Sequence, residues 1–263
     1  MTDMLTTPEF DQLLRALKLS GIKHTLLERL ALAKQRNLSH ASFLELVLAD
    51  EHARRENVSA GQRAYKAGLD PSLRVETWQE LDDVSYDREL WSDLIGGGWI
   101  HNRSNVLVLG PVGVGKTHLA TALGHIAIRR RIPTLFVRAD RLFHRLKAAR
   151  LDNTVEAEHR RLAVVKLLVI DDFALRGMDG TQTSDFYELI VERHQRWPTI
   201  ITSNRDPSEW IGQMADTLLA QAAIDRVTAG AHILVVDGPS YRQRTKGSAD
   251  RFLDNQDGTN HAR

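Results

Sequence analysis

Hydrophobic residues near the start of the chain recur every three or four positions, which is the spacing of one helical face. Two successive segments follow this pattern, with a break at Gly21 between them. Their periodic residues are Phe10, Leu13, Leu14 and Leu17, followed by Ile22, Leu26, Leu27, Leu30 and Leu32. The pattern predicts two short amphipathic helices.

A third, longer helix is predicted to end near Lys66. Ser39 or Ser42 offers the hydroxyl that commonly caps a first helical turn, and Gly68 follows the last turn. The three helices together make an expected N-terminal helical domain, residues 1–70. The later turns of the third helix carry a polar and basic strip, formed by Arg55, Gln62, Arg63 and Lys66. Such a strip is either a solvated helix face or a surface that contacts phosphates.

Beyond residue 104 the pattern changes to short apolar runs separated by helical segments. Each run is rich in leucine or β-branched residues, as buried strands are. The five runs are Asn105–Leu109, Thr134–Val137, Leu167–Ile170, Thr199–Thr202 and Ile233–Val236. Strands that alternate with helices pair in parallel through right-handed crossovers. We therefore expect an α/β domain at residues 104–245, with a parallel five-stranded sheet flanked by helices.

Residues 71–103 are expected to link the two parts and to begin the second. Val75–Trp78 is a possible short strand, and a helix is predicted near Asp87–Leu94. Residues 246–263 are polar and are expected to fray as a flexible tail.

Composition narrows the class of protein. The 263 residues are 42% hydrophobic and 26% charged, which is ordinary for a soluble globular chain. There is no cysteine, so disulfide bonds and thiolate metal sites are excluded. The first ten residues show no secretory signal, and the most apolar stretch, Leu162–Ile170, is too short to cross a bilayer. A cytoplasmic protein without a membrane partner is expected.

The first apolar run leads into a glycine-rich segment that matches the phosphate-binding pattern G-x-x-x-x-G-K-[ST], and a helical pattern follows it. The segment consists of Gly110, Pro111, Val112, Gly113, Val114, Gly115, Lys116 and Thr117. Its glycines let backbone N–H groups turn toward one phosphate, and the N-terminus of the helix adds positive potential. We expect Lys116 to reach the β- and γ-phosphates of ATP and the Thr117 hydroxyl to ligate Mg²⁺.

Two acids, Asp171 and Asp172, close the apolar run Leu167–Ile170. A carboxylate at the end of a buried strand beside the phosphate loop is placed to hold Mg²⁺, which is the role expected of Asp171. Asp172 is expected to position or deprotonate the attacking water. A helix cap is the alternative for either acid.

Three further polar residues are candidates whose roles the spacing leaves open. Asn204 ends the run that begins at Thr199, where it either touches the γ-phosphate or forms an Asx turn before Pro207. Arg226 lies in a helical segment and Arg242 follows the last run. A surface ion pair is the alternative for each arginine.

Taken together and in order, these motifs resemble the IstB-like helper ATPases of insertion sequences, which are AAA+ proteins close to the DnaC helicase loader. The likeness covers nearly the whole chain. It rests on Gly110–Ala120, Leu168–Asp172, Thr202–Asn204, Asp225–Arg226, Ser240–Arg242 and the N-terminal run Leu44–Lys66.

The resemblance implies roles for single residues. Asn204 is implied to be the sensor-1 residue, Arg226 an arginine finger that enters the neighbouring subunit's ATP site, and Arg242 the sensor-2 arginine of its own subunit. His118, within the matching run, is counted with the ATP-binding residues. Many related ATPases carry glutamate where this chain has Asp172, so slow hydrolysis is expected. The resemblance further implies ATP-dependent self-assembly on duplex DNA, and recruitment and stimulation of a separate transposase.

The charge of the chain is unevenly placed although its net charge is only +1. The segment Arg129–Arg150 holds eight Lys or Arg residues against one acid, and Glu76–Asp93 holds seven acids against one base. The basic segment offers candidate contacts to DNA phosphates at Arg141, Arg145, Lys147 and Arg150. The alternatives are a solvated face or pairing with the acidic segment at a subunit interface. Phe143 and Leu146 are expected in the core.

Three other functions remain open from the sequence. A helicase loader would share the ATPase but act on a replicative helicase. A small-molecule kinase would share the phosphate loop, yet no acceptor site is evident. A third possibility is an ATP-gated DNA scaffold that does not hydrolyse ATP.

Overall fold

The computed structural model describes residues 7–79 and 83–241, and they divide into two compact units. The division falls between Gln62 and Arg63, inside one long helix. The first unit contains α1 (Pro8–Ala16), the 3-10 turn η1 (Ser20–His24), α2 (Leu26–Arg36) and most of α3 (His40–Lys66). The three predicted helices are therefore present. Of the two serines predicted as possible caps of α3, Ser39 precedes the helix, and its hydroxyl accepts a hydrogen bond from the Ser42 N–H at 3.1 Å.

The apolar face of the first unit is narrower than its periodicity predicts. Leu14, Ile22, Leu26 and Val47 form a small buried cluster. Leu13 and Leu17, by contrast, are 59% and 65% exposed. Helix α1 ends at Ala16, so Leu17 lies beyond its last residue, and Leu14 is the buried residue of this helix.

The second unit begins with the end of α3 and contains the sheet. Before the sheet come η2 (Val75–Thr77), α4 (Arg88–Gly96) and α5 (Gly98–His101). The remaining elements are β1 (Val106–Leu109), α6 (Lys116–Arg129), β2 (Thr134–Arg138), α7 (Ala139–Leu151), α8 (Val155–Val164), β3 (Leu167–Phe173), α9 (Gly180–Arg193), β4 (Thr199–Ser203), α10 (Pro207–Trp210), η3 (Ile211–Gln213), α11 (Thr217–Thr228) and β5 (His232–Val235).

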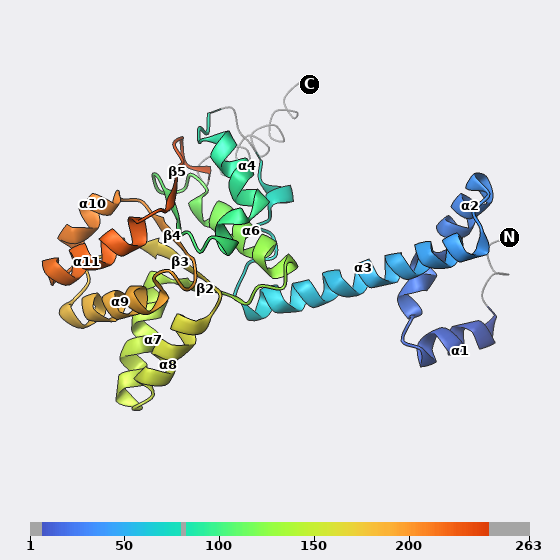
Figure 1. The fold of residues 1–263 in the computed structure, drawn as a ribbon, viewed down its shortest axis with the longest axis horizontal. Helices are drawn as coiled ribbons and strands as arrows, with labels where there is room; N and C mark the ends of the chain where they lie inside the picture. Colours follow the sequence, from blue (N-terminus) through green and yellow to red (C-terminus); the bar gives the residue numbers. More distant parts are fainter. Residues whose placement is uncertain (1–6, 80–82, 242–263) are drawn as a thin grey trace, which may run out of the picture. The chain divides into compact units, whose positions relative to one another are not determined.

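The five predicted strands form one parallel sheet in the order β2-β3-β4-β1-β5. Helices cover both of its faces (Figure 1). Residues of α4, α5 and α6 share a core with one face, and residues of α7 to α11 share a core with the other. The strands β1, β3 and β4 are buried along their whole length or nearly so, which explains their unbroken apolar runs. The predicted α/β architecture is confirmed.

One predicted strand is wrong. Val75–Thr77 is a 3-10 turn, because the Thr77 side chain folds back on its own segment. Its hydroxyl donates to the Ser72 carbonyl at 2.6 Å and accepts from the Arg74 N–H at 2.9 Å. The helix predicted near Asp87–Leu94 is present as α4, capped by the Asp87 carboxylate.

Within the described residues, none of the helices combines the length and the apolar character needed to cross a membrane. The predicted tail, residues 246–263, lies outside the described part of the chain.

Candidate functional site

The glycine-rich segment lies at the carboxyl edge of the sheet, between β1 and α6. Gly110 has a φ of 149°, and a Cβ there would lie 1.9 Å from the Val236 carbonyl oxygen. Gly115 has a φ of 111°, and a Cβ there would meet the Trp78 ring at 2.5 Å. The loop curls tightly against its neighbours and has a positive φ at both positions, so only glycine fits there.

Lys116 is the first residue of α6, and it is 6% exposed. Its ammonium group donates to the Pro111 carbonyl at 2.7 Å. The side chain therefore folds back over the loop, where backbone N–H groups and the start of a helix favour a bound anion. This is the geometry that phosphate binding requires.

An irregular register next to the loop brings both acids of β3 into the site. Ile170 pairs with Ile201, whereas Phe173 pairs with Ser203, so two residues of β3 face the single residue Thr202. Asp172 has a φ of 56°, in the left-handed region. Its N–H donates to the Thr202 hydroxyl at 2.9 Å. This bulge interrupts the alternation of a regular strand, and both carboxylates lie beside the phosphate loop.

Asp171 is a buried carboxylate held by hydroxyl groups. It is 3% exposed. The Thr202 hydroxyl donates to its Oδ1 at 2.6 Å and the Thr117 hydroxyl donates to the same oxygen at 2.9 Å. Burial raises the pKa of Asp171 above its usual range, and the hydrogen bonds from the two threonines oppose that rise. A bound cation would remove the cost of this buried charge.

These oxygens fit Mg²⁺. The ion prefers hard oxygen ligands, and in nucleotide sites it takes one or two from the protein and the rest from phosphates and water. The Thr117 hydroxyl and the Asp171 carboxylate provide such a pair. Phosphate oxygens of the nucleotide and water would supply the remaining ligands. Among the described residues there is no cluster of three or more His, Cys, Asp or Glu side chains that could hold a metal ion.

A cavity of about 580 Å³ lies at this edge of the sheet and is large enough for a nucleotide. The predicted residues that line it are Val112, Gly113, Gly115, Lys116, Thr117, His118, Asp172 and Asn204. Asp171 reaches the site through its bond to Thr117. Folding therefore gathers three separate motifs around one space.

Several residues of this cavity were not found from the sequence. Trp78 packs over Gly115 and meets the His118 ring edge-on, with the ring centroids 5.1 Å apart. Gln79 accepts from the Tyr241 hydroxyl at 3.2 Å, and both residues line the cavity. Arg138 lines it as well. Tyr241 belongs to the Ser240–Arg242 motif, whereas Trp78, Gln79 and Arg138 belong to none, and their tertiary positions alone bring these three here.

Arg226 lies at the opposite edge of the sheet. It sits in the last turn of α11, where its guanidinium donates to the Ala222 carbonyl at 2.6 Å and lies over the Tyr187 ring. It lines a cavity with Asn105, which precedes β1, and Gly230, which precedes β5. The arginine is thus remote from the phosphate loop of its own chain. Arg242 lies outside the described residues.

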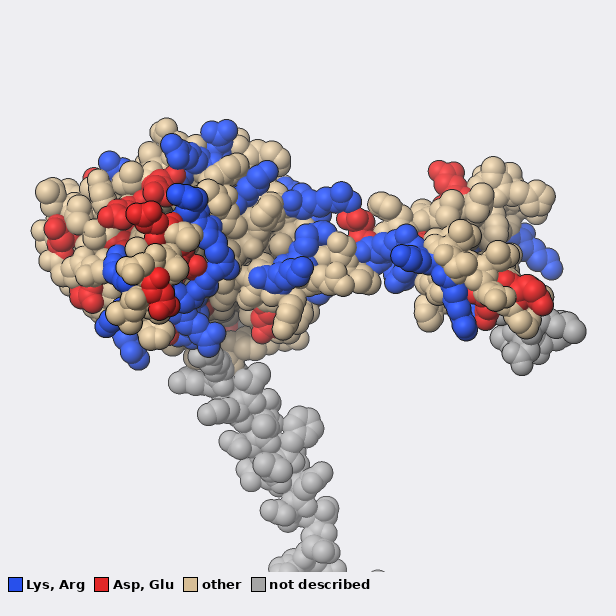
Figure 2. Space-filling view, turned by 90° about the horizontal axis from the view of Figure 1, so that it is seen from below, with Lys and Arg blue, Asp and Glu red and all other residues tan. Residues whose placement is uncertain are grey.

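The basic residues of α7 point in different directions. Arg145 pairs with Glu158 on α8 at 2.5 Å, and Arg150 pairs with the buried Asp185 on α9. The side chains of Arg141 and Lys147 make no hydrogen bond or ion pair with residues 7–79 or 83–241. Figure 2 shows Lys and Arg side chains gathered in a band across the larger unit. On α7 itself, Arg141 and Lys147 are the cations open to a partner, while Arg145 and Arg150 are engaged.

The basic residues of α3 are largely engaged with their own unit. Arg55 donates to the Glu51 carboxylate at 2.7 Å and to the Lys18 carbonyl. Arg63, in the second unit, donates to the Ile128 carbonyl at 3.3 Å. Lys66 is exposed. Contacts of these three residues to DNA stay predictions.

Comparison with known sequences identifies relatives along nearly the whole chain. The family model of the IstB-like ATP binding protein matches residues 12–249. A protein described as an ATP-binding protein in an insertion sequence of Mycobacterium tuberculosis is 34% identical over 240 residues, which are 91% of this chain and 96% of that protein. The corresponding protein of insertion sequence IS21 from Pseudomonas aeruginosa is 30% identical, covering 92% and 91% of the two chains.

Comparison with solved structures shows a shared fold at low sequence identity. DnaI is 20% identical with a TM-score of 0.54, covering 62% of this chain and 90% of that one. The DnaC helicase loader is 20% identical with a TM-score of 0.50, covering 66% and 98%. DnaA from Aquifex aeolicus, bound to AMPPCP, is 20% identical with a TM-score of 0.51, covering 71% and 56%.

Proposed function

The chain belongs to the family of IstB-like ATP-binding proteins of insertion sequences, and we propose that it hydrolyses ATP and uses ATP as an assembly switch on duplex DNA. In this proposal the assembled protein recruits and stimulates the transposase of the same element, and hydrolysis resets the assembly. The observation that carries the proposal is the convergence of Lys116, Thr117, Asp172 and Asn204 on one cavity beside Asp171.

Each residue has a task in hydrolysis. Lys116 and the loop N–H groups bind the β- and γ-phosphates, and Asn204 orients the attacking water. Asp172 accepts a proton from that water as its oxygen bonds to the γ-phosphorus. The bond from the γ-phosphorus to the bridging oxygen breaks, and ADP and phosphate leave. Mg²⁺ held by Thr117 and Asp171 would neutralise charge on the phosphate oxygens.

The position of Arg226 supports action between subunits. It lies at the edge of the sheet opposite to its own phosphate loop, so in this proposal it serves an ATP bound to a neighbouring copy. Arg242 is proposed to contact the ATP of its own subunit. A site completed by a neighbour would make hydrolysis depend on assembly.

Mixing two inactive variants tests this arrangement. Arg226→Ala should bind ATP yet lose on the order of 10³-fold in turnover, the effect of an arginine supplied in trans. Lys116→Ala should lose ATP binding. Mixed assemblies should regain activity, because an intact Arg226 from one subunit meets an intact loop in the other. A mixture of Lys116→Ala with Asp172→Asn serves as the matched control.

In that control mixture each active site lacks either Lys116 or Asp172, so no activity should return. Turnover that stays absent when Arg226→Ala and Lys116→Ala subunits are shown to co-assemble would rule out Arg226 as the group acting in trans. Asp172→Asn alone should bind ATP and stay assembled. Turnover of Asp172→Asn at the unaltered rate would contradict its role as the base.

The assembly itself is tested by electron microscopy with duplex DNA in the presence of ATP, ADP or no nucleotide. We expect DNA-bound oligomers with ATP and their loss with ADP or with Lys116→Ala. The partner is tested by co-sedimentation of the assembled protein with the transposase of the same element or with a replicative helicase. Binding to the helicase alone would favour a loader, to which the chain is related here by fold only.

A further inference from the structure

The cavity that Arg226 lines has a volume of about 500 Å³ and lies at the amino edge of the sheet. The segments that lead into β1, β4 and β5 line it together with the end of α11. Because these strands are parallel, their first residues meet at one edge and the phosphate loop lies at the other. The cavity therefore faces away from the nucleotide site of its own chain.

This cavity is cationic. Arg103 and Arg226 line it, and the described residues around it include neither Asp nor Glu. His101 and His194 also line it, and their ring nitrogens make no hydrogen bond with the described residues. Positive charge that a fold leaves without a carboxylate partner attracts an anion from outside the chain.

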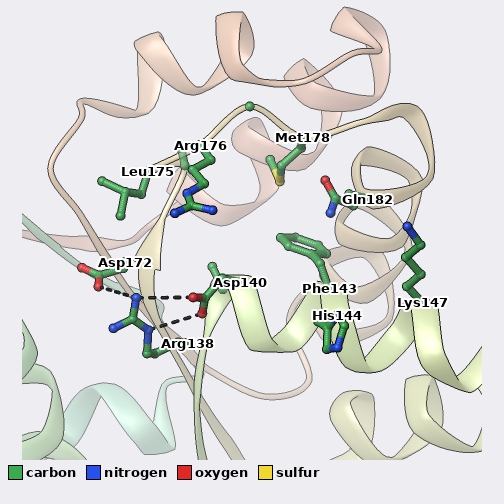
Figure 3. A pocket seen from close by; sticks show the side chains of 13 residues that line it. Arg138, Asp140, Phe143, His144, Lys147, Asp172, Leu175, Arg176, Met178 and Gln182 are labelled. Carbon is green, nitrogen blue, oxygen red and sulfur yellow. Dashed lines mark hydrogen bonds and ion pairs between the residues drawn. The ribbon is translucent and has the colours of Figure 1, made fainter.

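The cavity of about 330 Å³ beside the nucleotide site differs in this respect (Figure 3). Its arginine, Arg138, lies 3.3 Å from a carboxylate oxygen of Asp140 and 3.5 Å from one of Asp172. Both acids line that cavity. The carboxyl edge of the sheet thus supplies anions for its own arginine, whereas neither Arg103 nor Arg226 forms an ion pair within the described part of the chain.

Arg103 is the more exposed of the two arginines. Its guanidinium donates to the Gln195 carbonyl at 3.1 Å, which directs the side chain toward the turn after α9. Its other N–H groups have no partner among the described residues. Arg103 follows the end of α5 with a φ of 58°, a position where glycine is the commonest residue. The local backbone therefore gives no reason for an arginine at this position.

Asn105 fixes the segments that carry both arginines. Its side-chain N–H donates to the Val227 carbonyl at the end of α11, at 2.9 Å. Its side-chain oxygen accepts from the Thr199 N–H at the start of β4, also at 2.9 Å. The start of β1, the start of β4 and the end of α11 are thereby joined around one side chain. Two guanidinium groups on such a frame suit an anion whose charge is spread over several oxygens.

We propose that this cavity receives the phosphates of ATP bound to a second copy of the chain, and that Arg103 is a second cation acting in trans beside Arg226. The partner is a second copy because its nucleotide edge carries the anion that the amino edge lacks, so that two copies fit head to tail. Arg103 donates to phosphate oxygens of that ATP. The inference rests on the proposed function and deepens it, since it adds a residue and a surface to the contact between subunits.

The test measures ATP turnover with duplex DNA at concentrations where assembly is confirmed. Arg103→Ala should turn over ATP about tenfold more slowly, the effect of losing one charged contact. Arg103→Lys keeps the charge without the planar fork and should recover part of that loss. The matched control is Arg196→Ala, which removes an exposed arginine next to Gln195 that does not line the cavity. It should turn over ATP like the unaltered protein.

Mixing assigns the effect to a neighbouring subunit. Addition of Lys116→Ala should raise turnover per Arg103→Ala subunit several-fold, because an intact Arg103 then meets an intact phosphate loop. In the control mixture the added chain carries both Lys116→Ala and Arg103→Ala. No intact Arg103 is present there, so turnover should not rise.

A double variant separates a second cation from a residue that only positions Arg226. Arg103→Ala added to Arg226→Ala should lower the residual turnover by about tenfold again, because Arg103 has its own contact. Equal turnover of the double variant and of Arg226→Ala alone would overturn the inference. An equal slowing by Arg196→Ala and Arg103→Ala would overturn it as well, since the effect would then be one of general charge.

Two outcomes of the mixing experiment separate this inference from the proposal beneath it. If Arg226→Ala regains activity with Lys116→Ala but Arg103→Ala does not, only the inference is overturned. If neither mixture regains activity although co-assembly is shown, the proposed action between subunits is overturned and the inference falls with it.

Discussion

Two regions of the second unit each bury a carboxylate, and the two carboxylates differ in the charge of their hydrogen-bond partners. Asp171, at the nucleotide edge, and Asp185, on α9 under the outer helices, are 3% and 2% exposed. Asp185 receives a charged partner from its own chain, Arg150, and a hydrogen bond from His159. The hydrogen bonds that Asp171 receives from described side chains come from the hydroxyl groups of Thr117 and Thr202.

The electrostatic result follows from those partners. The His159 and Arg150 hydrogen bonds hold the pKa of Asp185 below its usual range against the opposing effect of burial. At Asp171 burial dominates and raises the pKa. Asp185 therefore has a cationic partner at hydrogen-bonding distance within the fold, whereas the hydrogen-bond partners of Asp171 are uncharged hydroxyl groups.

A buried cation at the other edge of the sheet extends the comparison. Arg193 is 2% exposed and has no carboxylate partner among the described residues. It donates to the Thr199 hydroxyl and to backbone carbonyls, including those of Leu162 and Pro198. Burial lowers the pKa of Arg193 to about 9. It ties together the segments that lead into β3 and β4.

Of the substitutions that test this comparison, one at Arg193 is expected to change the free energy of unfolding most. Arg193→Met keeps much of the side-chain volume but leaves several buried acceptors without a donor, so the free energy of unfolding should fall by about 3 kcal/mol. Denaturant unfolding measures this, with the exposed neighbour Arg196→Met as the control. A loss below about 1 kcal/mol would show that water or other donors satisfy those carbonyls.

Asp185→Asn should come next. It removes the charge that Arg150 and His159 surround, and the free energy of unfolding should fall by about 2 kcal/mol. Glu192→Gln, an exposed acid on the same helix, is the control and should be close to neutral. Equal stability of the two variants would remove the contrast with Asp171.

In protein free of nucleotide and Mg²⁺, Asp171→Asn should change the free energy of unfolding in the opposite direction to Arg193→Met and Asp185→Asn. Since its folded pKa is raised, the ionised group costs stability at neutral pH, and the neutral amide should increase the free energy of unfolding by on the order of 1 kcal/mol. The same variant should bind Mg²⁺-ATP more weakly by about tenfold or more, measured by calorimetry. A lower free energy of unfolding for the nucleotide-free variant would contradict the inference that the ionised Asp171 carboxylate costs stability.

The smallest expected effect is a pH dependence at His159. Its hydrogen bond with Asp185 raises the pKa of His159 above 6.5 in the folded protein. The stability it contributes is therefore fully present below pH 6.5 and is lost as the pH rises through the folded value, by less than about 1 kcal/mol. His159→Gln should flatten this slope in unfolding curves between pH 6 and 9. An unchanged slope would assign it to another group.

The sequence by itself determined the parts of the fold and site that depend on local order. The five apolar runs predicted the five strands. For β1, β3 and β4 the reason is that strands buried on both faces need unbroken hydrophobic residues. The spacing from Gly110 to Thr117 predicted the phosphate loop, because its glycines and lysine act within eight consecutive residues.

Only the tertiary structure decided which separate segments meet. The bulge between β3 and β4 brings both Asp171 and Asp172 to the site, and it arises from pairing between the two strands. Arg138 lies 3.5 Å from the Asp172 carboxylate because β2 pairs with β3. Trp78 covers Gly115 from a segment whose local pattern suggested a strand. The basic residues of α7 differ in their partners for the same reason. Arg150 pairs with Asp185, whereas the Lys147 side chain makes no hydrogen bond or ion pair with the described residues. Periodicity records which face of an element is apolar, but the partner of each charge depends on distances between elements, which a single chain pattern does not contain.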